Sequence, residues 1–209
     1  MHETMCSEVL SMKVLIIYAH PSPDSFTWHA KESFISGLAA AGHTCVVSDL
    51  YAMGFQTDIS EKEYLREAYY NLDVPVPEDV RAEQEKVNAC DAIVFIYPVF
   101  WTDAPAKLKG WFDRVWTFGY AYGEGGVRRT IKQLEKGLVI CITGHTKDDL
   151  QAFGYLDSMK SVMLGDRMFD RVKCKEMIVL DDMSRLTPNV RQEKWDRHLQ
   201  TAFEAGRTI

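Results

Sequence analysis

Short apolar runs alternate along the chain with segments in which apolar residues recur every three or four positions. The first run, Lys13-Val-Leu-Ile-Ile-Tyr-Ala19, is rich in β-branched residues and stops at His20-Pro21. Such a run predicts a strand that is buried on both faces, as in a parallel sheet. Apolar residues then recur at a spacing of four until Gly42, which predicts an amphipathic helix over residues 25–41.

The same alternation continues to the end of the chain. Further strands are predicted over residues 44–49, 92–97, 138–142 and 175–180, and further helices over residues 77–90, 104–115 and 190–205. Asp103 is placed to cap the helix at 104–115. Five strands separated by helices predict a doubly wound α/β domain, a five-stranded parallel sheet with helices on both faces. We expect residues 12–209 to form this single domain and residues 1–11 to be a flexible tail.

Two connections are too long for the simple alternation. Residues 54–77 are rich in acids and tyrosines, and residues 151–172 are Met-rich and helical in pattern. In a compact domain, connections of this length usually form lids, binding loops or oligomer contacts.

Charge and cysteine content narrow the function class. The chain has 24 Lys plus Arg against 30 Asp plus Glu, a net charge of −6, which argues against a nucleic-acid-binding protein. Because no apolar run approaches the roughly 18–20 residues of a membrane span, and no secretory signal opens the chain, we expect a cytoplasmic protein. The five cysteines are odd in number and lack a zinc spacing, which favours reduced thiols and no metal site.

In doubly wound sheets, ligands bind at the carboxyl ends of the strands, where the strand order reverses. The loop after the first strand, residues 20–27, has no glycine and so is neither a GxGxxG nor a Walker A loop. Its hydroxyls and the N–H groups of the helix that follows nevertheless suit an anionic phosphate, and His20 could add a ring N–H. Alternatively, Asp24 or Ser25 simply caps the helix and His20 is a turn residue.

The loops after the third and fourth strands suit a flat ligand. Phe100 and Trp101 are adjacent aromatics, which can stack on a planar ring, although they could instead fold back on the helix that follows. Residues 143–146 are small or hydroxyl-bearing, so a ligand could approach their backbone and N–H donors closely. Such donors would suit the electron-rich edge of a reduced flavin, although an ordinary turn also explains them.

Four segments together resemble the NAD(P)H:quinone oxidoreductases, the DT-diaphorase branch of the flavodoxin-like proteins. They are HPSPDSF at 20–26, DLY at 49–51 with Met53 and Phe55, AEQ at 82–84, and YPVFWTDAPAKLKGWFDRVWTFGYAY at 97–122. The last segment is the most specific. The likeness covers roughly residues 12–145 and fades afterwards.

The resemblance implies a flavodoxin-like fold and a homodimeric flavoprotein that reduces quinones or similar flat acceptors by two electrons in a ping-pong cycle. It implies FAD as the cofactor, with FMN possible, and NADH or NADPH as the electron donor. The residues that match the family's cofactor loops are His20, Ser25, Phe26 and Thr27 for the phosphates, Pro98, Val99, Phe100 and Trp101 for flavin stacking, and Thr143, Gly144 and His145 for the pyrimidine edge. Tyr120 and Tyr122 match tyrosines of the substrate pocket, and His145 and Tyr155 are candidates for the proton relay.

The chain also departs from the family pattern. Thr27 stands where asparagine is common, and Ile142-Thr-Gly-His145 stands where better-known members have Thr-Thr-Gly-Gly. Two alternatives with the same fold also stay open: a flavin-bearing ancillary subunit of a potassium-efflux transporter, and a flavodoxin-type electron carrier. Against the carrier, the chain lacks the Thr/Ser-x-Thr-Gly-x-Thr phosphate loop. The physiological acceptor and the choice between NADH and NADPH stay undecided.

Overall fold

Five parallel strands form one sheet in the order β2-β1-β3-β4-β5. Their bounds are β1 (Lys13–Tyr18), β2 (Thr44–Asp49), β3 (Ala92–Pro98), β4 (Leu134–Ile142) and β5 (Val172–Leu180). The computed structural model describes residues 11–183 and 188–209, so the expected tail lies outside the described residues except for Ser11. The five-stranded parallel sheet is confirmed, and the strand order reverses between β1 and β3. The limits of the domain stay a prediction.

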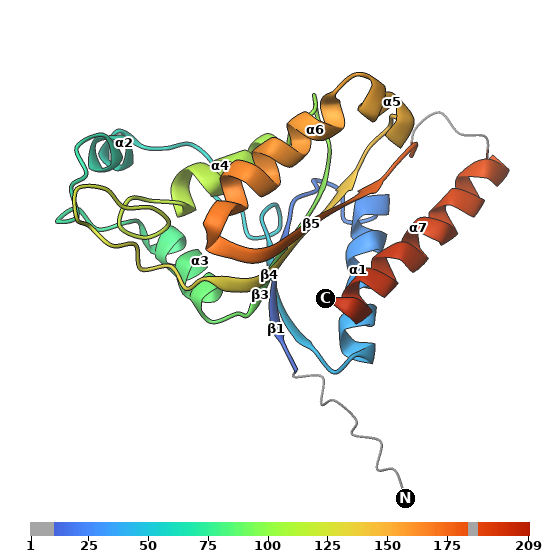
Figure 1. Cartoon of the computed structure of the whole chain (residues 1–209), viewed down its shortest axis with the longest axis horizontal. Helices are drawn as coiled ribbons and strands as arrows, with labels where there is room; N and C mark the ends of the chain where they lie inside the picture. Colours follow the sequence, from blue (N-terminus) through green and yellow to red (C-terminus); the bar gives the residue numbers. More distant parts are fainter. Residues whose placement is uncertain (1–10, 184–187) are drawn as a thin grey trace, which may run out of the picture.

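The central strands separate two hydrophobic cores, because successive side chains of a strand point to opposite faces of the sheet. In β1, Val14 and Ile16 face one core, and Leu15 and Ile17 face the other. Helices α1 (Phe26–Ala40) and α7 (Pro188–Thr208) cover the first face; α3 (Glu78–Asn88), α4 (Ala106–Val115) and α6 (Tyr155–Lys160) cover the second (Figure 1). With both faces covered, β3 is buried along its whole length, which is why its sequence is a continuous apolar run.

The last two strands of the chain are longer than the apolar runs indicate. β4 begins at Leu134 and β5 at Val172, where the expected starts were 138 and 175. The added residues form the first pairs of the β4–β5 ladder, with Leu134 opposite Val172 and Lys136 opposite Cys174. Glu135 and the residues 173–176 are exposed, so these strand ends carry polar side chains that no hydrophobic pattern marks.

Helices α1 and α7 touch through their backbones. A Cβ atom on Gly37 would lie 2.0 Å from the carbonyl oxygen of Phe203, and one on Gly206 would lie 2.1 Å from that of Phe34. No side chain larger than hydrogen fits at either crossing point. The chain therefore uses two glycines to bring its first and last helices into direct contact.

Both long connections contain helices. Residues 54–77 include α2 (Glu61–Ala68), which begins with a capping box between Ser60 and Glu63. Residues 151–172 begin at the end of α5 (Lys147–Ala152) and include α6, a π-helix (η1, Ser161–Met168) and a short 3-10 turn (η2, Phe169–Arg171). Met159 and Met163 are buried in the core, whereas Val162 is partly exposed. The Met-rich segment is therefore a helical cover for one face of the sheet.

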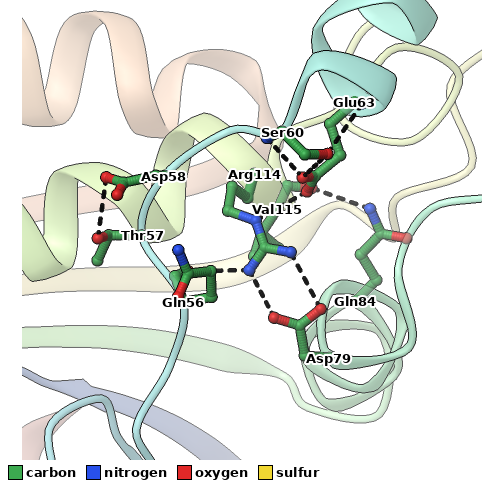
Figure 2. Close-up of polar contacts among 9 residues, drawn as sticks. All are labelled: Gln56, Thr57, Asp58, Ser60, Glu63, Asp79, Gln84, Arg114 and Val115. Atoms are coloured by element: carbon green, nitrogen blue, oxygen red, sulfur yellow. Dashed lines mark hydrogen bonds and ion pairs between the residues drawn. The ribbon is translucent and has the colours of Figure 1, made fainter.

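Arg114 joins α4 to α2, α3 and the connection between β2 and α2 (Figure 2). Its Nε donates to Glu63 Oε1 at 2.7 Å, and its terminal nitrogens donate to both carboxylate oxygens of Asp79 and to the carbonyl of Gln56 at 2.8 Å. Burial alone would raise the pKa of both carboxyl groups, but the bonds from Arg114, and from Ser60 to Glu63, outweigh it and hold both pKa values below their usual range. The guanidinium is almost completely buried, so it depends on these partners.

Replacing Arg114 with methionine is expected to lower the free energy of unfolding at pH 7 by about 3 kcal/mol, because two carboxylates lose their shared partner. The depressed carboxyl pKa values contribute stability above their ordinary values of 4.5 and 3.8, and this stability is lost as the pH falls through the folded-state values. Urea unfolding at pH 7 and below pH 4.5 should therefore show a smaller difference between wild type and variant at the lower pH.

Lys109→Met is the matched control, since Lys109 pairs with Asp113 on the exposed side of the same helix. It should change the free energy by no more than about 0.5 kcal/mol. Equal effects of the two substitutions would contradict the assignment of Arg114 as the buried link.

Candidate functional site

The carboxyl ends of β1, β3 and β4 are neighbours in the sheet, so the three loops that follow them lie along one edge. The backbone continues the ladder into these loops. Ala19 N–H donates to Ile96 O at 3.1 Å, and Val99 N–H donates to Ile142 O at 2.7 Å. Residues 20–27, 98–103 and 143–146, which are far apart in the sequence, therefore lie along one edge of the sheet, and the first two flank the point where the strand order reverses.

In the first loop, the donors available to a ligand are chiefly backbone N–H groups. Ser25 caps α1, and its Oγ accepts from Trp28 N–H at 3.1 Å. Among the described residues, none accepts from the N–H groups of Phe26 or Thr27, which open the helix. The first turn of α1 holds no acidic residue of its own, although the exposed Asp24 carboxylate just before the cap lies 3.3 Å from His29 Nε2 in that turn.

His20 lies in the same loop with its ring partly buried. In the tautomer in which Nδ1 accepts from Ser22 N–H at 3.0 Å, Nε2–H is the remaining donor of the ring. Burial lowers the pKa of His20, with the Ser22 backbone contact opposing the shift, so the ring is mainly neutral at pH 7. His20 can therefore offer an anionic ligand a hydrogen bond rather than a full charge.

The side chains of Phe26 and Thr27 are packed within the protein and are not presented to a ligand. The ring of Phe26 packs edge-on against Trp195 of α7 at 4.8 Å, and Thr27 is buried. Both the capping and the phosphate-binding interpretations of this loop are compatible with the structure, since Ser25 caps the helix while the first N–H groups stay unpaired.

The second loop ends in a tight turn with a strained backbone. Phe100 N–H donates to Asp103 O at 2.9 Å, and Asp103 N–H donates to Phe100 O at 3.1 Å. The two residues between them, Trp101 and Thr102, have φ values of 51° and 66°. Turns with two positive φ values favour Asn-Gly, whereas a bulky and a β-branched residue here cost about 1–3 kcal/mol each.

This turn presents its aromatic side chain to solvent. Trp101 is fully exposed and Phe100 is half exposed, so neither ring folds back on α4 as the alternative interpretation required. A large exposed ring on a strained backbone is typical of a ligand-binding feature, because the fold gains nothing from it.

Asp103 does not cap the helix that follows, contrary to expectation. Helix α4 begins at Ala106 with Pro105 at its cap position and no side-chain cap. The carboxylate of Asp103 instead accepts from Ala104 N–H and forms two bonds with Arg167, of 2.9 and 3.1 Å. The ion pair with Arg167, 64 positions further along the chain, thus takes the place of the capping bond expected for Asp103.

In the third loop, Thr143 is buried and its Oγ1 accepts from His145 N–H at 3.1 Å. The exposed ring of His145 lies 6.5 Å from that of Phe153, which lies 5.5 Å from that of Tyr155. His145 and Tyr155 are therefore on one aromatic row, joined by Phe153. No sequence pattern marks Phe153 as part of the site, because only the turn at Gly154 brings it beside the loop.

The two tyrosines of the 117–122 segment have different positions. Tyr120 is buried in its own chain, and its hydroxyl donates to Gln84 O at 3.1 Å. That is the position of a core side chain, so the structure does not support its assignment to a substrate pocket. Tyr122 is partly exposed, and its hydroxyl donates to Glu67 of α2 at 2.9 Å.

A groove of about 710 Å³ lies elsewhere, between β4, β5 and the end of α7. Leu138 and Ile178 contribute apolar surface to it, with Lys136 and Arg197 among its charged residues. None of the residues singled out from the sequence lines this groove.

The strand order, together with the loops after β1, β3 and β4 along one edge of the sheet, defines a doubly wound protein of the flavodoxin type. A family profile described as flavodoxin-like fold matches residues 12–200, and the chain belongs to that family. Within it, the chain resembles the NAD(P)H:quinone oxidoreductases, as its sequence motifs indicate.

Three relatives illustrate the range of the likeness. An NAD(P)H:quinone oxidoreductase from Methanothermobacter marburgensis is 47% identical with a TM-score of 0.86, over 94% of this chain and 96% of that one. The ribosyldihydronicotinamide dehydrogenase (quinone) of Homo sapiens is 37% identical over 123 residues, 53% of each chain. An FMN-dependent NADH-azoreductase from Bacillus anthracis, solved in complex with FMN, shares the fold at 19% identity and a TM-score of 0.65, over 91% of this chain and 97% of that one. The chain spans about half the length of the first curated relatives it matches.

Two further findings concern the described part of the chain, residues 11–183 and 188–209. Its His, Cys, Asp and Glu side chains form no group of three that could hold a metal ion. No helix in the same residues is long and apolar enough to cross a membrane.

Proposed function

We propose that this protein is a flavin-dependent oxidoreductase that uses NADH or NADPH to reduce quinones or similar flat acceptors. The observation that carries the proposal is the placement of three neighbouring loops along the carboxyl edge of the sheet, at and beside the switch point, one of which holds the exposed Trp101 on a strained turn. The similarity to NAD(P)H:quinone oxidoreductases supports the same reaction class.

The donor set of this edge fits a flavin with its phosphate groups. The N–H groups of Phe26 and Thr27 and the ring of His20 would hold the phosphates, and Trp101 would stack on the planar ring system. The 143–145 loop would supply N–H donors to the polar edge of that ring. When bound, the flavin supplies the hydride-transfer chemistry, and the chain supplies orientation and exclusion of water.

We propose FAD as the cofactor, because the DT-diaphorase branch that the motifs resemble usually carries it. FMN is the alternative, supported by the FMN named for the Bacillus anthracis azoreductase, which shares the fold. His145 and Tyr155 are proposed to supply or accept the proton that accompanies hydride transfer, since both are exposed beside the third loop.

The purified protein, reconstituted if necessary with FAD or FMN, is expected to be yellow and to lose its flavin absorbance on anaerobic mixing with NADH or NADPH in a stopped-flow spectrometer. A panel of quinone, nitro and azo acceptors should then restore the absorbance. Chromatography of the released flavin identifies the cofactor. A protein that binds neither flavin would refute the proposal, and one that binds flavin without oxidising NADH or NADPH would favour the electron carrier.

Trp101→Ala is expected to weaken flavin binding by about 0.5–1.5 kcal/mol, because a stacked aromatic contributes that much beyond its buried area. Titration of the apoprotein with flavin, followed by flavin fluorescence, measures the dissociation constant. Trp101→Phe is the matched control and should retain most of the affinity. Unchanged affinity in Trp101→Ala would show that the ring does not contact the cofactor.

We also propose that the protein is a homodimer. Apolar side chains are exposed along α2 and on the residues that flank it: Ile59, Tyr64, Leu65, Tyr69, Tyr70 and Leu72. Tyr122 adjoins this surface through its bond to Glu67, and Tyr70 contacts Phe118 at 4.5 Å. So large an exposed apolar surface is typical of an interface between chains.

Light scattering of the purified protein should therefore give the mass of a dimer, and Leu65→Asp combined with Tyr69→Asp should shift it towards the monomer. Val47→Asp, at an exposed apolar position on β2, is the control and should leave the mass unchanged. A monomeric wild-type protein at micromolar concentration would contradict the proposal.

A further inference from the structure

We propose that Arg167 is a positioning residue for the Trp101-Thr102 turn, and that its pair with Asp103 sets the affinity of the edge for flavin. The inference rests on the proposed function for the identity of the ligand. It assigns a role to the π-helix η1, which none of the sequence motifs includes.

The contact between the two residues is a forked ion pair. The terminal nitrogens of Arg167 donate to the two carboxylate oxygens of Asp103 at 2.9 and 3.1 Å. Parallel bonds of this kind fix direction as well as distance, which a lysine cannot do. Asp103 is the last residue of the turn, and its backbone makes both bonds that close it.

Arg167 itself is held from several sides. Its side chain is 6% exposed, its guanidinium lies 4.9 Å from the centre of the Phe112 ring, and one nitrogen contacts Met163 Sδ at 3.1 Å. Its backbone carbonyl accepts from Trp116 Nε1 at 2.7 Å. The carboxylate of Asp103, in contrast, is 44% exposed. The arginine is therefore the fixed partner, and the loop is the partner that it holds.

The turn needs such an anchor because its backbone is unfavourable. Trp101 and Thr102 both have positive φ, so a freed turn would relax to negative values and redirect the Trp101 ring. The base of the loop is fixed by Val99 N–H on Ile142 O, which leaves the Asp103 side as the second point of attachment. Two attachments, one on each side, hold the strained residues between them.

A purely structural ion pair would stabilise the fold without affecting the turn. Thr102→Gly separates the two roles, because glycine adopts a positive φ without strain and so reduces the need for the anchor. If Arg167 acts on the turn, Thr102→Gly should compensate for its loss. If Arg167 acts only on stability, the glycine should have no such effect.

The test uses the full chain as apoprotein, with wild type, Arg167→Lys, Asp103→Asn, Thr102→Gly and the double variant Arg167→Lys/Thr102→Gly. Flavin dissociation constants are expected to rise about tenfold in Arg167→Lys and in Asp103→Asn, and to return to within a few-fold of wild type in the double variant. Asp103→Asn keeps the experiment informative if Arg167→Lys does not fold, since Asp103 lies on the exposed side.

A second measurement does not depend on flavin. In apoprotein labelled with 5-fluorotryptophan, the ¹⁹F resonance of Trp101, assigned with Trp101→Phe, should shift or broaden in Arg167→Lys and recover in the double variant. An unchanged resonance, or a loss of flavin affinity that Thr102→Gly does not restore, overturns the inference. Failure of the wild type to bind flavin would instead reject the proposed function, while the resonance still tests the anchor.

Discussion

A parallel sheet has to be covered on both faces, and this constraint arranges the rest of the molecule. Because β1 and β3 bury both rows of their side chains, helices must occupy the two faces, and the connections are displaced to the edges of the sheet. At the carboxyl edge, the reversal of strand order moves the helices apart, and the loops after β1, β3 and β4 are left beside one another. The candidate site follows from where the apolar residues have to go.

Both faces of the sheet are covered by apolar packing, but the elements on each face are held to one another by different means. On the face of α1 and α7, packing is apolar and includes the backbone contact at Gly37 and Gly206. On the opposite face, buried arginines form bonds between separate elements: Arg114 joins three of them, and Arg167 joins the π-helix to the aromatic loop. Directional bonds of this kind fix the position of loops that hydrophobic packing alone would leave variable.

The sequence was sufficient for the order and type of the main elements, because both depend on local patterns. The β-branched run at 13–19 and the spacing of four in the first helix are visible in a short window, and the loops that end the strands could be named from them. Polar strand ends such as Glu135 could not, since their partners lie in another strand.

The details of the candidate site depend on contacts between distant residues, and these were harder to predict. The local sequence around Asp103 predicts a helix cap, but its carboxylate pairs with Arg167 instead. Tyr120 matches a family motif, but its side chain is buried in the core of its own chain. The positive φ of Trp101 and Thr102 runs against the preference of both residue types, so no local rule could have found it. The placement of Phe153 beside His145 likewise became visible only in three dimensions.

The crossing of α1 and α7 has a mechanical consequence for the phosphate loop. Helices that touch backbone to backbone cannot slide or roll past one another, because neither has a side chain at the crossing that could change rotamer and yield. The first helix is therefore braced along its length by the last one, and the ring contact between Phe26 and Trp195 extends that brace to its first turn. The N–H groups that open α1 are thus supported by two helices in direct contact. A displacement of α7, the last helix, is therefore transmitted through α1 to the loop at residues 20–27, near the start of the chain.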